Sequence, residues 1–315
     1  MRTRVWAVLF LLSSAPALAQ MLSDRGPPLH RFVHRNTLAI RVNPLGLLYD
    51  GRFVYRQRLY VAESTALRDN FLGIGIAPGA SPAFARLGVI VEVQPATMLG
   101  FWAVYEYMQY FGTFNLLASY PSASANFSDS AIRNRMPPPS TTGGTMLTFG
   151  ANLNLKVGPI VLRSQAKLMA PDFKLRPGDT VLYDQFSDLL LANGRFTFTN
   201  DLDLLFQTRF GLVAGVRYNV GIPIYGPENT AKEDNSTHRL GPFVAYRFFD
   251  HDGARFNQPT IAVVINWYLK HRWRTGADSP AALPYMALAF NVVGDLIPLQ
   301  PAPVKADDAP EVPSP

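Results

Sequence analysis

The segment from Thr145 to Met169 constrains the fold more than any other part of the chain. It reads TMLTFGANLNLKVGPIVLRSQAKLM, and apolar and polar residues alternate on both sides of the KVGP stretch. A period of two residues is typical of a β-strand with one apolar and one polar face. Two such strands joined at a Gly-Pro turn predict an antiparallel hairpin. The pattern alone leaves open which of the two faces meets water.

The N-terminal residues indicate that the chain is exported. The stretch MRTRVWAVLFLLSSAPALAQ contains two arginines, an apolar run from Val5 to Leu12, and Ala17-Leu18-Ala19 before Gln20. This order is typical of a secretory signal peptide over residues 1–19, and its short apolar run and charged flank are untypical of the alternative, a buried N-terminal helix. The chain has no cysteine. We therefore expect no lipoprotein anchor, no disulfide and no thiolate metal site.

Composition favours a membrane protein that crosses the bilayer with strands. Hydrophobic residues make up 48% of the chain and charged residues 17%, against about 25% charged in ordinary soluble domains. Beyond the signal peptide, no apolar run approaches the roughly 18 residues of a membrane-spanning helix. The net charge of +6 falls to +4 when Arg2 and Arg4 are removed. The remaining basic residues are spread singly along the chain, so we expect no nucleic-acid partner.

The alternation predicts twelve strands, most of them long enough to cross a bilayer at a tilt. They are 37–48, 52–62, 70–77, 84–94, 98–110, 145–157, 160–170, 195–206, 211–222, 238–249, 257–270 and 283–293. From the fourth strand onward, long and short connections alternate, and the long ones are 111–144, 171–194, 223–237 and 271–282. If short turns face the periplasm and long loops the exterior, an even strand number returns both chain ends to the periplasm.

These observations predict an all-β fold, an antiparallel transmembrane up-and-down β-barrel of about twelve strands, with ten as the other possibility. A two-sheet sandwich is the alternative, but it does not account for loops sorted by end. The predicted organisation is a signal peptide at 1–19, an N-terminal periplasmic segment at 20–36, a barrel at 37–294, and a tail at 295–315. The tail is rich in proline and is expected to be disordered.

At this level the chain resembles the outer-membrane β-barrel proteins of Gram-negative bacteria, over about residues 37–294. The stretch NTLAIRVNPLGLLYDGRFVYRQRLY is similar to the first hairpin of uncharacterised outer-membrane families that open with Asn-Pro-Leu-Gly-Leu-Leu, here Asn43 to Leu48. Tyr55 also matches, but Arg56 stands where those families have Glu, so any role of that Glu does not transfer. The resemblance implies location in the outer membrane, contact with lipid and lipopolysaccharide, and insertion by the barrel-assembly machinery. It implies no activity.

A membrane barrel puts the polar face of each strand in the lumen, because charge facing lipid costs about 2–4 kcal/mol at the bilayer midplane. Alternation then predicts nine basic and four acidic lumen residues: Arg41, Arg56, Arg58, Arg86, Lys156, Arg163, Lys167, Arg217 and Arg247, with Glu92, Glu106, Asp201 and Asp203. Three-residue turns after Gln94 and Gln207 would set Arg86 opposite Glu106, and Asp201 opposite Arg217.

Two functions fit such a lumen. The first is a narrow channel for small solutes that prefers anions, because basic residues are in excess. The loop 111–144 would then fold in as a constriction that carries Arg133 and Arg135. The second is a structural or adhesion barrel whose lumen is filled with ion pairs and which acts through its long outer loops.

A third and weaker candidate is a lipid hydrolase of the outer membrane. Such an enzyme needs a nucleophile and a base, and the stretch KEDNSTHR offers Ser236 and His238, with Glu233 and Asp234 upstream and His271 as a second base. No further catalytic motif accompanies this pair, so we expect that the protein is not an enzyme. The sequence has no phosphate-binding glycine loop and no metal-ligand spacing, and we expect no cofactor.

Overall fold

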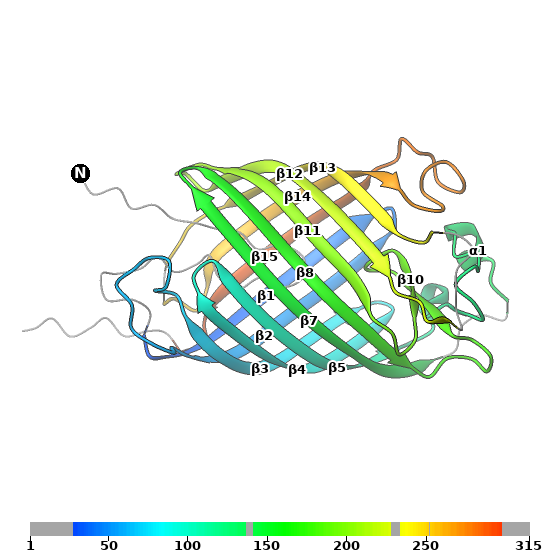
Figure 1. Ribbon diagram of the computed structural model, residues 1–315, viewed down its shortest axis with the longest axis horizontal. Coiled ribbons are helices and arrows are strands. Elements are labelled where there is room, and N and C mark those ends of the chain that lie inside the picture. The colour runs from blue at the N-terminus through cyan, green and yellow to red at the C-terminus, as the bar shows by residue number, and fades with distance from the viewer. Residues whose placement is uncertain (1–27, 137–140, 228–233, 252, 298–315) are drawn as a thin grey trace, which may run out of the picture.

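The barrel prediction is confirmed. The computed structural model describes residues 28–136, 141–227, 234–251 and 253–297, and twelve antiparallel strands form a closed barrel in which β1 pairs with β15 (Figure 1). The wall strands are β1 (His30–Val42), β2 (Gly46–Gln57), β3 (Phe71–Ser81), β4 (Phe84–Ala96), β5 (Leu99–Tyr110), β7 (Thr142–Val157), β8 (Ile160–Phe173), β11 (Thr197–Gln207), β12 (Leu212–Pro223), β13 (Thr237–Arg247), β14 (Asn257–Lys270) and β15 (Tyr285–Asp295).

The β7–β8 hairpin shows which face lies inside. Val157 pairs with Ile160, and the turn between them contains Gly158, whose φ of 57° lies in the left-handed region that glycine adopts without strain. Along β7 the polar side chains of Thr148 and Asn152 are buried, whereas Phe149 is exposed on the outer wall. The polar face therefore points into the barrel.

The same alternation runs around the whole wall, so the exterior is a belt of exposed apolar side chains. Closing the sheet leaves no strand edge, and every wall strand pairs on both sides. The belt includes Leu38, Ile40, Ile74, Ile76, Val89, Val91, Phe101, Phe149, Leu162, Leu202, Leu204, Val216, Val244, Val263, Trp267, Leu288 and Phe290. No helix in the described part of the chain is long and apolar enough to cross a membrane.

The first wall strand begins at His30 rather than at Thr37, so residues 30–36 belong to the barrel and not to a separate periplasmic segment. The alternation was hidden there because polar and apolar residues occur on both faces, with Phe32 outside and Val33 inside. Arg31 points inward and forms an ion pair with Asp295 at the end of β15. The predicted signal peptide at 1–19 lies outside the described residues, as does the tail from 298 onward.

Two predicted registers were wrong by two residues. On β4 and β5, Arg86 pairs with Met108 and Gly88 with Glu106, because β4 continues to Ala96 and the turn to Leu99 lies further along the chain than predicted. On β11 and β12, the connection is longer than expected, and Asp203 rather than Asp201 lies opposite Arg217. A shift of two residues leaves each side chain on its predicted face.

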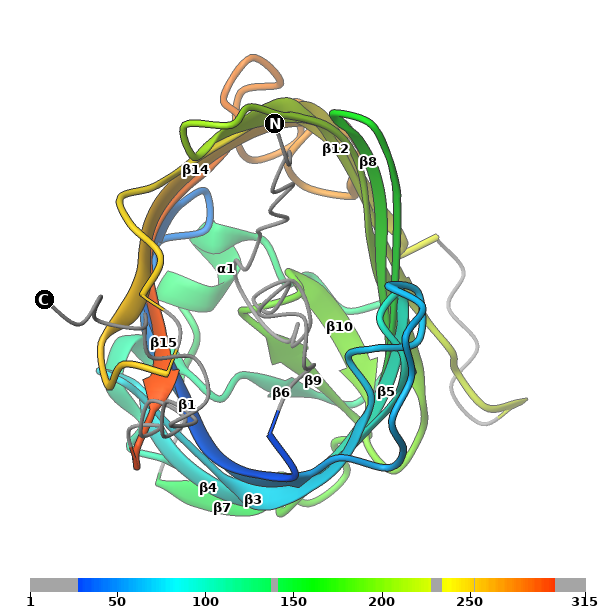
Figure 2. The ribbon, with the colours of Figure 1, turned by 90° about the vertical axis from the view of Figure 1, so that its left-hand side faces the viewer.

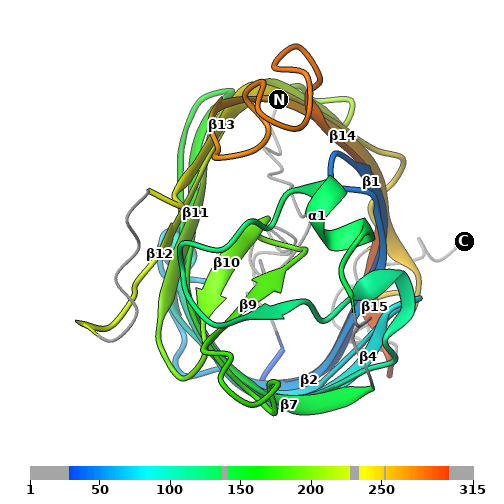
Figure 3. The same ribbon diagram turned by 90° about the vertical axis from the view of Figure 1, so that its right-hand side faces the viewer.

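The long connections at one end of the barrel fold back into it and form what we call the plug, residues 111–136 together with 174–196. Seen end on in Figures 2 and 3, β6 (Ser119–Tyr120), β9 (Val181–Asp184), β10 (Leu189–Ala192) and the helix α1 (Asp129–Arg133) lie within the outline of the wall strands, and Figure 1 shows α1 at the right-hand mouth of the barrel. The three short strands form a sheet in the order β10-β9-β6, and a 3-10 turn, η1 (Thr113–Asn115), precedes them.

The largest apolar core of the described chain lies where the plug meets the wall. Leu189, Leu190 and Leu191 of β10 are fully buried, and they belong to one cluster with wall residues such as Phe84 and Phe173. The plug is therefore fixed by apolar packing, as a core is, and fills this end of the lumen.

Candidate functional site

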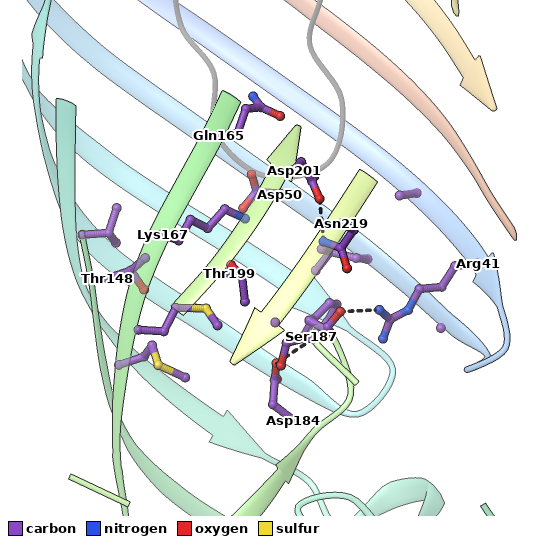
Figure 4. A pocket seen from close by; sticks show the side chains of 18 of the residues that line it. Arg41, Asp50, Thr148, Gln165, Lys167, Asp184, Ser187, Thr199, Asp201 and Asn219 are labelled. Carbon is purple, nitrogen blue, oxygen red and sulfur yellow. Dashed lines mark hydrogen bonds between the residues drawn. The ribbon is translucent and has the colours of Figure 1, made fainter. Parts of the chain in front are cut away.

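Beneath the plug, the lumen contains a cavity of about 210 Å³ that is lined by both wall and plug. Figure 4 shows Lys167, Asp50 and Asp201 extending into it from three different strands, with Asp184 and Ser187 of the plug on one side. The charged residues that line it are six basic and four acidic: Arg41, Arg52, Arg86, Lys167, Arg217 and Arg239, with Asp50, Glu106, Asp184 and Asp201. The lining therefore carries two more basic than acidic groups.

The first ion-pair cluster lies on β2, β4 and β5. Arg86 bridges two carboxylates, Asp50 and Glu106, and its Nη1 lies 3.1 Å from Oε1 of Glu106. Glycine on the neighbouring strand makes this possible, because a Cβ at Gly79 would lie 2.3 Å from Nε of Arg86. Gly79 of β3 thus leaves room for the Arg86 side chain of the adjacent strand.

The second ion-pair cluster joins β8, β11 and β12. The Asp203 side chain is fully buried, and it accepts hydrogen bonds from Nε of Arg163 and Nε of Arg217, both at 2.7 Å. Arg217 also lies 3.1 Å from Asp201. Both guanidinium groups face the ring of Phe243. One carboxylate therefore connects two arginines across three strands.

A third group, which we call the Arg239 patch, consists of Asn219, Arg239, Asn266 and Tyr285 on the successive strands β12 to β15. Nε and Nη2 of Arg239 donate to Oδ1 of Asn219 at 2.9 and 2.6 Å, and its guanidinium carbon lies 4.4 Å from the centre of the Tyr285 ring. Within the described residues, Nη1 of Arg239 and Oδ1 of Asn266 are buried without a hydrogen-bond partner. All four residues line the cavity.

Part of the cavity lining is apolar, on strands that also contribute Glu106 and Lys167. Met108, Met146 and Met169 line it from β5, β7 and β8. Trp102 lies next to them with its ring under the guanidinium of Arg52, at 4.5 Å. The cavity is therefore amphipathic, with a thioether side and a side rich in arginine.

The plug is also held by a buried polar cluster around Arg274, in the connection between β14 and β15. Arg274 donates to Asp188 at the tip of the β9–β10 hairpin, with Nε at 2.5 Å from Oδ2 and Nη2 at 3.0 Å from Oδ1. It donates two further bonds of 2.9 Å to Asp129 of α1 and one of 2.7 Å to Asn43 of the β1–β2 turn. One side chain thus joins both parts of the plug to the wall.

Burial and neighbouring charges shift the pKa values of Asp188 and His271 in this cluster. Burial alone would raise the pKa of the Asp188 carboxyl, but His271 and Arg274 outweigh that effect and hold this pKa well below its usual value. Burial lowers the pKa of His271. The hydrogen bonds agree with a neutral ring, because Nδ1 accepts from the backbone N–H groups of Trp273 and Arg274 while Nε2 donates to the carbonyl of Asp188.

The structure distributes the predicted lumen residues over different levels. Six of them line the cavity: Arg41, Arg86, Glu106, Lys167, Asp201 and Arg217. Five others lie on the inner wall nearer the end opposite the plug: Arg56, Glu92, Lys156, Arg163 and Asp203. Arg247 lies close to that end of β13 and forms an ion pair of 2.6 Å with Asp250. Arg58 was misplaced, because β2 ends at Gln57 and Arg58 lies just beyond the wall.

The predicted constriction by Arg133 and Arg135 was also wrong in detail. The loop does fold into the barrel, but Arg133 is exposed at the end of α1. Arg135 lies over the ring of Tyr120 and 3.6 Å from Asp179, where it packs inside the plug. Neither residue lines the cavity.

The Ser236 and His238 pair is not arranged as a nucleophile and base in the described contacts. The backbone N–H of Ser236 donates to Asp234, while Nδ1 of His238 lies 2.5 Å from the hydroxyl of Tyr218. His271, the second candidate base, is buried in the Arg274 cluster. Among the described residues, no group of His, Asp or Glu side chains is arranged to hold a metal ion.

Sequence reasoning missed four charged residues of the cavity lining, Asp50, Arg52, Asp184 and Arg239, and two residues that hold the plug, Asp188 and Arg274. Arg239 has the same parity as Arg247 on β13, so the alternation could have identified it. Asp50 was assigned to a turn that in fact belongs to β2. Asp188 and Arg274 lie in long connections, where no periodic pattern exists to indicate which side chains are buried.

No protein-family model matches the sequence, and no curated protein sequence matches it. Solved structures to which the chain is similar include CdiB from Acinetobacter baumannii, with a TM-score of 0.38 and 10% identity over 85% of this chain and 60% of that one. The translocator domain of the autotransporter NalP from Neisseria meningitidis has a TM-score of 0.38 and 9% identity, over 84% of this chain and 88% of that one. Acinetobacter baumannii OccAB1 has a TM-score of 0.39 and 8% identity, over 85% of this chain and 96% of that one. This chain thus spans less than two thirds of CdiB, and similarities this low carry no argument about function.

Proposed function

We propose that the protein is a β-barrel of the Gram-negative outer membrane whose lumen is a path for small solutes, closed by the plug in the state described. The observation that carries the proposal is the charged cavity of about 210 Å³ enclosed between the plug and the two ion-pair clusters. An ordinary protein interior is close-packed. A space of this size in the middle of a barrel, with ten charged residues in its lining, therefore fits a passage better than a solid core.

The outer wall supports the membrane part of the proposal. Its exposed side chains are apolar on strand after strand, whereas the buried side chains of the lumen are largely polar. Water as the outer solvent would favour the reverse arrangement. A closed barrel also satisfies the backbone hydrogen bonds that lipid cannot satisfy. On this proposal the partners of the outer wall are lipid and lipopolysaccharide, and the barrel-assembly machinery inserts it.

The excess of basic side chains supports a preference for anions. Six basic groups face four acidic ones around the cavity, and the field of such a lining concentrates anions in a narrow path. The test is the conductance of the refolded protein in a planar bilayer, with the reversal potential measured in a KCl gradient. We expect rare openings of the wild type, with a reversal potential that is closer to the equilibrium potential of chloride than to that of potassium. Openings that prefer cations would contradict the anion part of the proposal.

A second function, a structural barrel with a filled lumen, is favoured by the second ion-pair cluster. Asp203 binds both Arg163 and Arg217 and so links the inner faces of three neighbouring wall strands. On this reading nothing passes, even after the plug is released. Conductance of a plug-released variant therefore separates the two functions. Absence of enzymatic activity stays a prediction.

A further inference from the structure

We propose that the Arg239 patch binds the carboxylate and the neighbouring hydroxyl of a small organic acid, whose apolar part lies against the methionine side of the cavity. The proposal names the class of solute for the path proposed above and rests on that path for its biological role. Binding itself is a separate property of the cavity, and it can be measured without any conductance.

Arg239 differs from the other arginines of the cavity in its partners. Arg86 and Arg217 each contact two carboxylates, and Arg52 lies 3.4 Å from Glu92. Arg41 donates to the backbone carbonyls of Gln185 and Phe186 in the plug. Arg239 has no carboxylate within 4 Å among the described residues, and its only described hydrogen-bond acceptor is the amide of Asn219.

The patch offers one donor and one acceptor without partners. Nη1 of Arg239 is a charged donor, and Oδ1 of Asn266 is a neutral acceptor on a side chain that is 1% exposed. Both residues neighbour Tyr285, since Asn266 is its direct register partner and Arg239 lies over its ring. Buried polar atoms are nearly always paired. A ligand that accepts a hydrogen bond from Nη1 of Arg239 and donates one from an adjacent group to Oδ1 of Asn266 provides partners for both atoms.

The chemistry of such a ligand follows from these two atoms. A carboxylate accepts from a guanidinium through a charge-assisted hydrogen bond. A hydroxyl on the adjacent carbon donates to the amide oxygen. The two additional basic groups of the lining favour an anion over a neutral ligand. A 2-hydroxy acid combines these features.

The rest of the cavity sets the size and the apolar part. Its volume of about 210 Å³ lies below the roughly 300–1,000 Å³ of pockets for drug-sized ligands. Met108, Met146 and Met169 supply a thioether surface, and thioether sulfur contacts aromatic rings favourably. A 2-hydroxy acid with a single ring or a short aliphatic chain therefore fits the space.

The experiment is calorimetric titration of the purified full-length barrel in detergent with three probes of similar size: mandelate, phenylacetate, which lacks the hydroxyl, and mandelamide, which lacks the charge. We expect mandelate to bind at least about tenfold more tightly than either of the others, which corresponds to about 1.4 kcal/mol. Arg239→Gln should weaken the binding of mandelate by at least about tenfold. Asn266→Ala should remove the advantage of mandelate over phenylacetate.

The matched control is Arg247→Gln, which changes an inward arginine on the same strand that lies outside the cavity lining. It should leave binding unchanged. Equal binding of the three probes, no saturable binding by the wild type, or equal effects of the two arginine variants would overturn the proposal. If Arg239→Gln does not refold, the probe series on the wild type still decides. Binding without conductance would refute the path and keep the site, whereas conductance without binding would do the reverse.

Discussion

Arg274 is predicted to hold the plug in the barrel. We consider the substitution Arg274→Gln, which removes the cation from a side chain that is 3% exposed. Asp188, whose side chain is fully buried, then keeps its hydrogen bonds from the hydroxyl groups of Tyr183 and Tyr268, at 2.8 Å each, but loses its permanent counter-charge. Removing one partner of a buried ion pair costs about 3–5 kcal/mol.

The consequence depends on which state bears this cost. With the plug displaced, Asp188 is solvated and the cost disappears, so the variant favours the displaced state. At 1.4 kcal/mol for each factor of ten, the ratio of displaced to inserted plug rises by about 100- to 4,000-fold. We expect the open probability in a planar bilayer to rise with it, while the apolar belt of the wall keeps the barrel folded. The double variant Asp188→Asn with Arg274→Gln should recover part of the effect, because no unpaired charge remains.

The matched control is Lys270→Gln, which removes a cation from an exposed ion pair with Asp234 just before the same connection. Exposed pairs contribute about 0–1 kcal/mol, so its open probability should stay close to that of the wild type. If Arg274→Gln and Lys270→Gln behave alike, and both migrate as folded barrels in unboiled gel samples, the Arg274 cluster does not hold the plug.

Three further predictions concern the lumen and the pH response. Asp203→Asn leaves two arginines around a neutral group and should lower the free energy of unfolding by about 3–5 kcal/mol. Asp201→Asn changes a carboxyl that is 20% exposed and should lower the free energy of unfolding clearly less. Equal melting temperatures of the two variants would contradict the role given to the second ion-pair cluster. Gly150→Ala puts a Cβ 2.0 Å from the indole ring of Trp102 on the next strand and should lower the free energy of unfolding by about 1–3 kcal/mol. Gly100→Ala, whose Cβ meets nothing closer than 3.8 Å, should leave the melting temperature almost unchanged. Burial lowers the pKa of His271, so the neutral ring stabilises the inserted plug fully above the unfolded pKa of about 6.5, and this stabilisation is lost as the pH falls through the folded pKa. The open probability should therefore rise on acidification in the wild type and much less in His271→Gln. An equal rise in both proteins would show that His271 is not responsible.

Periodicity predicted the wall well because every position of a strand in a closed barrel faces either inward or outward. Thr148 and Arg163 had to face inward once Phe149 and Leu162 faced outward, and errors of register moved these assignments by even steps only. The Gly-rich β3 was the weakest part of the prediction, and one of its inward glycines, Gly79, is explained by the Arg86 side chain that fills its space.

The plug could not be predicted in the same way. Leu189, Leu190 and Leu191 form an apolar run without a period, which fits a core strand and a loop equally well. Asp188 and Arg274 lie far apart in sequence and meet only because two connections fold into one lumen. Such contacts depend on the three-dimensional path of irregular segments, and no local pattern encodes that path.

The most direct test of the central claim is the conductance of a barrel without the β9–β10 hairpin, made by replacing residues 178–194 with a short turn and compared with the wild type in the same bilayer. The account predicts a folded, heat-modifiable barrel with steady conductance and a reversal potential closer to the equilibrium potential of chloride than to that of potassium, against rare openings of the wild type. A folded barrel that stays closed without the hairpin would contradict the account, because closure of the path would then not depend on the hairpin that the Arg274 cluster holds in place.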